Sequence, residues 1–145
     1  LYSSAASDVY KRQDVYVAGA PEATQVSGDH TVTCASRFDF AELLPRTQVF
    51  VHHGGQNSMM DALSHEVPQL IVPGCVFERQ FNAEAEENAR CGLTVRAPKP
   101  ALIARAARRL VDEPALTSGI RGVRTELCSL GGGARIVREV EELAG

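Results

Sequence analysis

The chain has 145 residues, of which 44% are apolar and 23% are charged, and its net charge is −3. These values are ordinary for a soluble globular protein, and a slight negative charge gives no bulk attraction to nucleic acid or to anionic membranes. No apolar run approaches the ~20 residues that a membrane-spanning helix needs. We therefore expect a cytoplasmic protein with no nucleic-acid partner and no membrane insertion.

Residues 1–13 have no apolar period and no initiator Met. They resemble the translated adapter sequence that recurs at the ends of reading frames assembled from sequencing reads, as in metagenomic collections. We treat them as a non-native or disordered segment and expect the folded domain to comprise residues 14–145. On this interpretation the natural gene is longer at its N-terminus and the chain is a fragment; the alternative is a disordered natural terminus.

From residue 14 onward, short β-branched or aromatic runs alternate with amphipathic segments. The predicted strands cover residues 14–19, 31–35, 48–51, 69–72 and 93–96, with a polar loop at 22–29. The predicted helices cover residues 39–44, 58–65, 80–90, 102–111, 114–130 and 136–143. This alternation predicts the α/β class: a Rossmann-like parallel sheet flanked by helices, with a helical C-terminal tail.

The four cysteines are far apart and form neither a C-x-x-C pair nor a zinc-site spacing: Cys34, Cys75, Cys91 and Cys128. We expect reduced, buried thiols, and two disulfides are the alternative. The carboxylates Glu84, Glu86 and Glu87 are predicted to form a solvated helix face, because their spacing does not suit a catalytic pair.

The stretch from Val49 to Asp61 reads Val-Phe-Val-His-His-Gly-Gly-Gln-Asn-Ser-Met-Met-Asp, an apolar strand that runs into two glycines and a helix start. In parallel sheets ligands bind beyond the carboxyl ends of the strands. Glycines let a ligand approach the backbone, and the first N–H groups of a helix favour an anion such as a diphosphate. His53 is able to donate a further hydrogen bond to a phosphate oxygen.

The local pattern also has a simpler interpretation. It is an ordinary capped strand–helix turn, in which Asn57 or Ser58 caps the helix and Ser58 forms a variant capping box with Asp61. The residues by themselves leave these two interpretations open. Because neighbouring strand residues point to opposite faces, His52 is predicted to be a packed or surface residue and not a second ligand.

A longer pattern is more specific: His53 to Asp61, then Val67-Pro68, Pro73, Gln80 and Asn82. It resembles the donor-binding signature of family 1 glycosyltransferases. The resemblance implies the GT-B fold, in which two Rossmann-like domains face a cleft and the C-terminal domain binds a nucleotide sugar, commonly linked to UDP or dTDP. The bacterial branch that glycosylates macrolides, flavonoids and related lipophilic acceptors is the most similar.

The resemblance assigns roles by position. It implies that His53, Gly55, Asn57 and Ser58 hold the donor diphosphate. Asp61 stands where the family usually has Glu, which binds the ribose hydroxyls, and its shorter side chain makes that contact weaker or water-mediated.

Other roles follow from the same resemblance. Gln80 matches the family's sugar-binding Gln, whose acidic partner is replaced here by Arg79. Either Glu78 serves instead, or Arg79 changes the donor preference, or Arg79 is a solvent-facing residue at a helix start. Phe38 and Leu44 fall in the segment that packs around the nucleobase.

The implied reaction is an inverting transfer of a hexose to a hydroxyl of a lipophilic acceptor, without cofactor or metal. No catalytic residue is expected in this chain, because the general base belongs to the missing N-terminal domain, which is the expected protein partner. We thus expect the chain alone to bind a nucleotide sugar weakly and to transfer nothing. The alternatives are a one-domain subunit of a split glycosyltransferase with a membrane-bound partner, and a Rossmann-like binding or epimerase module.

Overall fold

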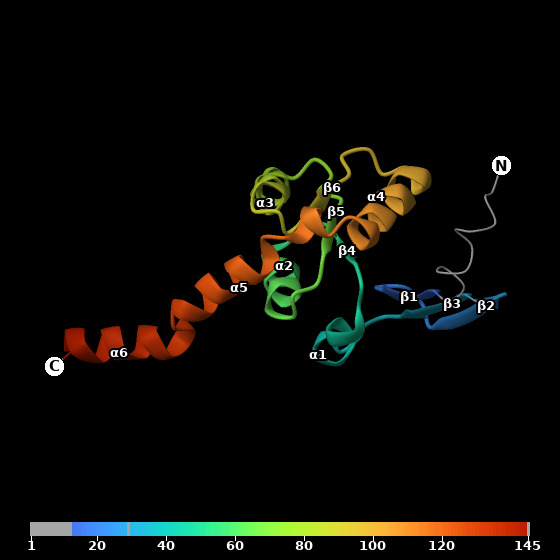
Figure 1. Ribbon diagram of the computed structural model, residues 1–145. Helices are drawn as coiled ribbons and strands as arrows, with labels where there is room; N and C mark the ends of the chain where they lie inside the picture. The colour runs from blue at the N-terminus through green and yellow to red at the C-terminus, as the bar shows by residue number, and fades with distance from the viewer. Residues whose placement is uncertain (1–12, 29, 145) are drawn as a thin grey trace. The chain divides into compact units, whose positions relative to one another are not determined.

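The computed structural model describes residues 13–28 and 30–144, and the chain divides into two compact units between residues 40 and 41 (Figure 1). Each unit has a three-stranded sheet of its own. The prediction for residues 1–13 concerns a segment outside the described residues, apart from Gln13, which begins the first strand.

The first unit contains β1 (Gln13–Ala18), β2 (Ala23–Ser27) and β3 (His30–Ala35) in the order β1-β3-β2. β1 and β3 are parallel, and both were predicted. β2 is antiparallel to β3, so the predicted polar loop at 22–29 is wrong. Ser27 pairs with His30, and Gly28 has a φ of +60°. In the sequence, Gly-Asp between two strand-forming runs is typical of hairpins.

After the short helix α1 (Phe40–Leu43) and the 3-10 turn η1 (Leu44–Arg46), the second unit forms a parallel sheet. Its strands are β4 (Phe50–His52), β5 (Gln69–Ile71) and β6 (Gly92–Thr94), in the order β4-β5-β6. This is the flanked parallel sheet that the alternating pattern predicted. It places the carboxyl ends of all three strands at one edge.

Two crossover helices connect these strands: α2 (Gln56–Ser64) and α3 (Phe77–Asn88). Figure 1 shows both on one side of the strands and α4 (Pro100–Asp112) on the other. α2 begins two residues earlier than predicted, because extended backbone at Gly55 already serves as its N-cap. α3 begins three residues earlier, directly after extended Val76.

The C-terminal segment contains the 3-10 turn η2 (Pro114–Thr117), α5 (Ile120–Ser129) and α6 (Gly132–Ala144). The single helix predicted over 114–130 is therefore wrong, because the chain passes close to another backbone segment at Gly119 before α5 begins. The apolar side chains of α6 face outward: Ile136 is 64%, Val137 56%, Val140 58% and Leu143 89% exposed.

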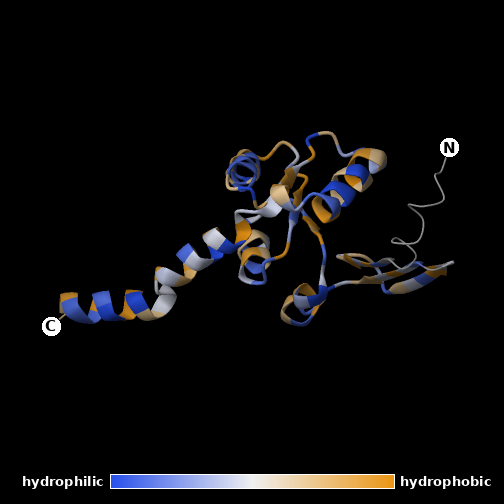
Figure 2. Ribbon diagram, in the orientation of Figure 1, coloured by the Kyte–Doolittle hydropathy of each residue, from blue (hydrophilic) through white to orange (hydrophobic). Residues whose placement is uncertain are grey.

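Two apolar clusters form the core of the second unit. Leu70, Val95 and Leu110 pack between the sheet and α4, whose hydrophobic stripe is visible in Figure 2. Leu63 and Ile120 join Cys91 in the other cluster.

The prediction of buried thiols is only partly right. Cys91 is fully buried and Cys34 half-buried, whereas Cys75 and Cys128 are exposed, and none of the four is disulfide-bonded. Cys75 follows the exposed turn at Gly74, and Cys128 lies on the outer side of α5.

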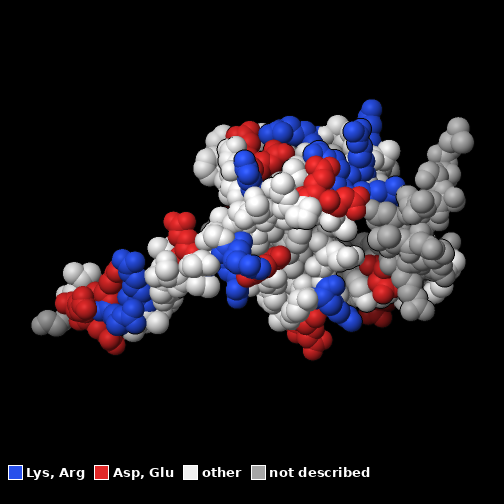
Figure 3. All heavy atoms as spheres, viewed as in Figure 1, with Lys and Arg blue, Asp and Glu red and all other residues white. Residues whose placement is uncertain are grey.

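Several arginines of the C-terminal helices pair with nearby carboxylates. Arg109 binds Glu113 at 2.8 Å, and Arg124 binds Glu66 at 2.9 Å. On the face shown in Figure 3, basic and acidic side chains lie next to one another along these helices. No helix within residues 13–28 and 30–144 is long and apolar enough to cross a membrane.

Candidate functional site

An open hollow of about 450 Å³ lies where β4 gives way to α2. Its walls are contributed by the turn after β4, the first turn of α2 and the first turn of α3. The lining residues are His53, Gly55, Gln56, Asn57, Ser58 and Glu78. The structure thus brings together all four residues predicted for the diphosphate and one residue predicted for the sugar.

The exposed ring of His53 leans back over its own turn. Its Nδ1 accepts a hydrogen bond from the N–H of Gly55 at 2.9 Å. Because this nitrogen is an acceptor, the neutral imidazole carries its proton on Nε2, which is left to donate to a ligand. A Cβ at residue 55 would collide with the imidazole ring of His53, so a larger residue here would displace the ring from the position that it holds in the structure.

The first turn of α2 presents unpaired amides. The first intrahelical hydrogen bond runs from the N–H of Met59 to the carbonyl of Gly55, at 3.1 Å. The N–H groups of Gln56, Asn57 and Ser58 precede this bond and have no intrahelical acceptor. Three such amides at the positive end of a helix favour an anion.

The predicted side-chain caps are wrong. Gly55 occupies the N-cap position, and no capping bond from a side chain is found there among the described residues. Asn57 and Ser58 lie inside the helix, so the proposed capping box between Ser58 and Asp61 does not form. The structure thus removes the side-chain caps from the simpler interpretation of this turn, and the binding of a diphosphate stays a prediction.

Gly54 is held on both sides. Its carbonyl accepts a hydrogen bond from Asn82 Nδ2 at 2.9 Å, and its N–H donates to His52 Nδ1 at 3.0 Å. Its φ of +85° favours glycine, and a Cβ would lie 3.0 Å from both the carbonyl oxygen of Arg79 and Cγ2 of Ile71. The turn is therefore fixed between β5 and α3.

His52 is a packed residue, as predicted, and it belongs to a buried polar chain. Its Nε2 lies 2.9 Å from Gln69 Oε1, and Gln69 Nε2 donates to Glu86 Oε2 at 2.8 Å. Gln69 is fully buried and Glu86 is 5% exposed, so the prediction of a solvated face was wrong for Glu86. Residues 69 and 86 are 17 positions apart, and no local pattern in the sequence links them.

Burial shifts the pKa values of this chain. Desolvation lowers the pKa of His52 to about 4, against the raising effect of its hydrogen bond to Gln69 and with a smaller contribution from His53. Desolvation raises the pKa of Glu86 to about 7. The neighbouring Cys91 thiol has its pKa raised to about 12 by burial and by Glu86. All three shifts favour the uncharged form.

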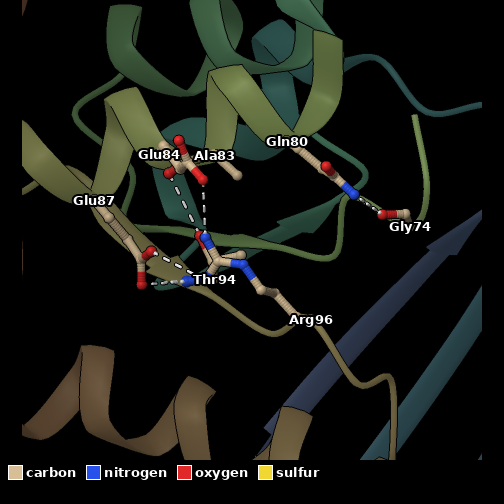
Figure 4. A network of polar contacts seen from close by, with 7 residues as sticks. All are labelled: Gly74, Gln80, Ala83, Glu84, Glu87, Thr94 and Arg96. Carbon is tan, nitrogen blue, oxygen red and sulfur yellow. Dashed lines mark hydrogen bonds and ion pairs between the residues drawn. The ribbon is translucent and has the colours of Figure 1, made fainter. Parts of the chain in front are cut away.

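The residues predicted for the sugar occupy the start of α3. Glu78 lines the hollow, whereas Arg79 is half-buried and is not among the lining residues. Gln80 donates from Nε2 to the carbonyl of Gly74 at 2.9 Å, which leaves its Oε1 as an acceptor (Figure 4). The structure thus places Glu78 at the hollow, and the roles of Glu78 and Arg79 toward a sugar stay predictions.

Further along α3, polar contacts tie the helix to β6 (Figure 4). The N–H of Thr94 donates to Glu87 Oε1 at 3.1 Å, and Arg96 lies 3.4 Å from Glu84. These contacts join the C-terminal half of α3 to β6 and to the segment that follows it.

The remaining predicted residues lie elsewhere. Asp61 is exposed on α2, one turn beyond the lining residues Asn57 and Ser58. Leu44 is 1% exposed. Phe38 belongs to the first unit, where its ring meets that of Tyr16 edge to face at 5.6 Å. Their roles toward ribose and nucleobase stay predictions.

A parallel sheet with a hollow at the carboxyl end of a strand defines the class of Rossmann-like α/β domains. Residues 19–143 match the family described as "Erythromycin biosynthesis protein CIII-like, C-terminal domain". The chain therefore belongs to this family of glycosyltransferase C-terminal domains, which confirms the resemblance found in the sequence and argues against an epimerase module.

Similar proteins agree with this assignment. The chain is 31% identical to the 3-alpha-mycarosylerythronolide B desosaminyl transferase of Saccharopolyspora erythraea, over 70% of this chain and 24% of that protein. It is similar to the structure of the spinosyn forosaminyltransferase SpnP, with a TM-score of 0.76, 25% identity and coverage of 88% of this chain and 34% of that one. For the glycosyltransferase VinC, solved in complex with dTDP, the TM-score is 0.74 and the identity 26%, over 83% of this chain and 30% of that one. The chain thus spans about a quarter to a third of these relatives.

Proposed function

We propose that the chain is the donor-binding half of an inverting glycosyltransferase that takes a UDP- or dTDP-linked hexose and transfers it to a hydroxyl of a lipophilic acceptor. The observation that carries this proposal is the hollow at the start of α2, where His53 and three open amides converge. The family membership supports it, as does the dTDP complex of the similar VinC.

In this reaction the groups that face the leaving diphosphate contribute most to the stabilisation of the transition state. The acceptor oxygen attacks the anomeric carbon, the bond from that carbon to the diphosphate oxygen breaks, and the diphosphate leaves with the electron pair. Negative charge therefore grows on the phosphate oxygens in the transition state. Nε2–H of His53 and the amides of residues 56–58 stabilise it there.

The other predicted contacts complete the donor site in this proposal. Asp61 follows Asn57 by one helical turn and so shares a face of α2 with it, in reach of a ribose next to the diphosphate. Glu78 and Gln80 offer oxygen acceptors to the sugar hydroxyls. The acceptor proton goes to a general base in an N-terminal domain, so the chain alone transfers nothing; turnover by the isolated chain in a coupled assay would contradict this part.

Replacing His53 by Ala tests the diphosphate contact. We expect about 10- to 100-fold weaker binding of UDP and dTDP by isothermal titration calorimetry, because a hydrogen bond to a charged group contributes about 1.5–3 kcal/mol. His65→Ala is the matched control, since His65 lies at the opposite end of α2. Unchanged affinity in His53→Ala, or no binding by the parent protein, would overturn the proposal.

A further inference from the structure

We propose that His52, and not only its exposed neighbour, is a positioning residue of the donor site. Through the buried relay Gly54–His52–Gln69–Glu86, it fixes the turn that aims the open amides of α2 at the diphosphate. The inference about the ligand rests on the proposed function, whereas the relay itself is a property of the fold.

The directions of the hydrogen bonds admit one protonation state. A backbone N–H is always a donor, so the bond from Gly54 requires Nδ1 of His52 to be unprotonated. The ring proton is then on Nε2 and points at Gln69 Oε1, 2.9 Å away. Gln69 must turn its NH₂ the other way, where Glu86 accepts it at 2.8 Å. The N–H of Gly54 thus fixes the tautomer of His52, which in turn fixes the amide orientation of Gln69 toward Glu86.

The relay is rigid because it is enclosed. Gln69 is fully buried in β5, Glu86 is 5% exposed in α3, and the ring of His52 stacks on Phe50 with centroids 5.0 Å apart. Breaking any link leaves a buried polar atom without a partner, which is costly. The lowered pKa of His52 keeps the acceptor nitrogen available.

The two adjacent histidines act on the same turn from opposite faces. Each accepts an N–H from two residues ahead: His52 from Gly54 inside the fold, and His53 from Gly55 at the hollow. Gly54 is further tied through its carbonyl to Asn82. Without the bond to His52, the N–H of Gly54 loses this acceptor, and the remaining bond to Asn82 lets Gly54 shift; such a shift displaces Gly55, the N-cap from which the open amides begin.

Two substitutions separate the links of the relay. His52→Phe keeps a stacked ring but removes the acceptor for Gly54. His52→Asn places Oδ1 where Nδ1 stands, so it retains the acceptor for Gly54 and loses the hydrogen bond to Gln69. We expect His52→Phe to bind dTDP about tenfold more weakly in NMR titrations while thymidine binding is unchanged, and His52→Asn to retain most of the dTDP affinity.

The relay is also tested without any ligand. Long-range ¹H–¹⁵N spectra of the parent protein should show His52 as the Nε2–H tautomer, and the Gly54 amide should exchange faster in His52→Phe than in His52→Asn. An Nδ1–H tautomer overturns the inference, and so does an equal loss of dTDP and thymidine binding in His52→Phe, which would indicate general disruption. If the parent protein binds neither ligand, the proposed function fails, while the tautomer and exchange data still decide the relay.

Discussion

Replacing Glu86 by Gln is expected to stabilise the protein by about 3 kcal/mol at pH 8 and to leave its stability nearly unchanged at pH 4.5. Burial raises the pKa of Glu86 from 4.5 to about 7, so between these values the native state holds a proton that the unfolded chain has released. The contribution of Glu86 to stability therefore falls as the pH rises through this window, by about 1.4 kcal/mol per pH unit. Glutamine retains an acceptor for Gln69 but never acquires the buried charge.

Urea unfolding at pH 4.5, 5.5, 6.5 and 8 measures this difference. The control is Glu84→Gln on the same helix, where an exposed carboxylate makes only a surface ion pair to Arg96, and its effect should stay within about 0.5 kcal/mol at every pH. A Glu86→Gln difference that does not grow with pH would show that Glu86 is charged at little cost in the native state.

In the parent protein, the pH dependence of stability that comes from Glu86 is offset by that of His52. The pKa of His52 is lowered from 6.5 to about 4, so its contribution to stability is present above pH 6.5 and is lost as the pH falls toward 4. The pH ranges over which Glu86 and His52 change the stability overlap, and their contributions have opposite signs. In Glu86→Gln the opposing contribution of Glu86 is removed, so stability should rise with pH over this range.

Replacing Gly119 by Ala is expected to destabilise the protein by about 3 kcal/mol, at the upper end of the usual cost of overpacking. The N–H of Gly119 donates to the carbonyl of Arg90 at 3.0 Å, and a Cβ would overlap the carbonyl oxygen of Ala89. The obstructing carbonyl groups of Ala89 and Arg90 belong to the backbone, so no side-chain rotation relieves the contact. The chain after α3 and the start of α5 must then separate, which opens the cluster of Leu63, Cys91 and Ile120.

Gly122→Ala is the matched control within α5, because nothing lies within 4 Å of a Cβ at this position. Alanine in a helix interior is favoured over glycine by about 1 kcal/mol, so this variant should be slightly more stable than the parent protein. Thermal unfolding of both variants checks the pair. If both substitutions changed the stability equally and in the same direction, the backbone near Gly119 would accommodate a Cβ without a loss of stability.

Local patterns predicted most of the second unit. The strands β4, β5 and β6 and the helices between them follow from apolar runs and their spacing, and the hollow is formed largely by consecutive residues after His53. Glu78 illustrates what local patterns do not determine. Whether it or Arg79 faces the hollow depends on the phase of α3, which begins at Phe77 and not at residue 80.

The errors come from interactions that the sequence does not display. β2 is polar and is held by its pairing with β3, so its composition resembled that of a loop. Glu86 stands among other carboxylates on α3, and only the packing of β5 against that helix makes it a buried partner of Gln69. In the same way, the role of Gly119 depends on a carbonyl about 30 residues earlier in the chain.

The outward stripe of α6 has a consequence for dynamics. No residue of this helix is buried, and the bond from Arg135 to Glu139 adds only about 0.2–0.5 kcal/mol. Helices shorter than about 12–15 residues are marginal in water without a surface to pack on. We therefore expect Gly132–Ala144 to unfold locally much more often than the central strands β4, β5 and β6.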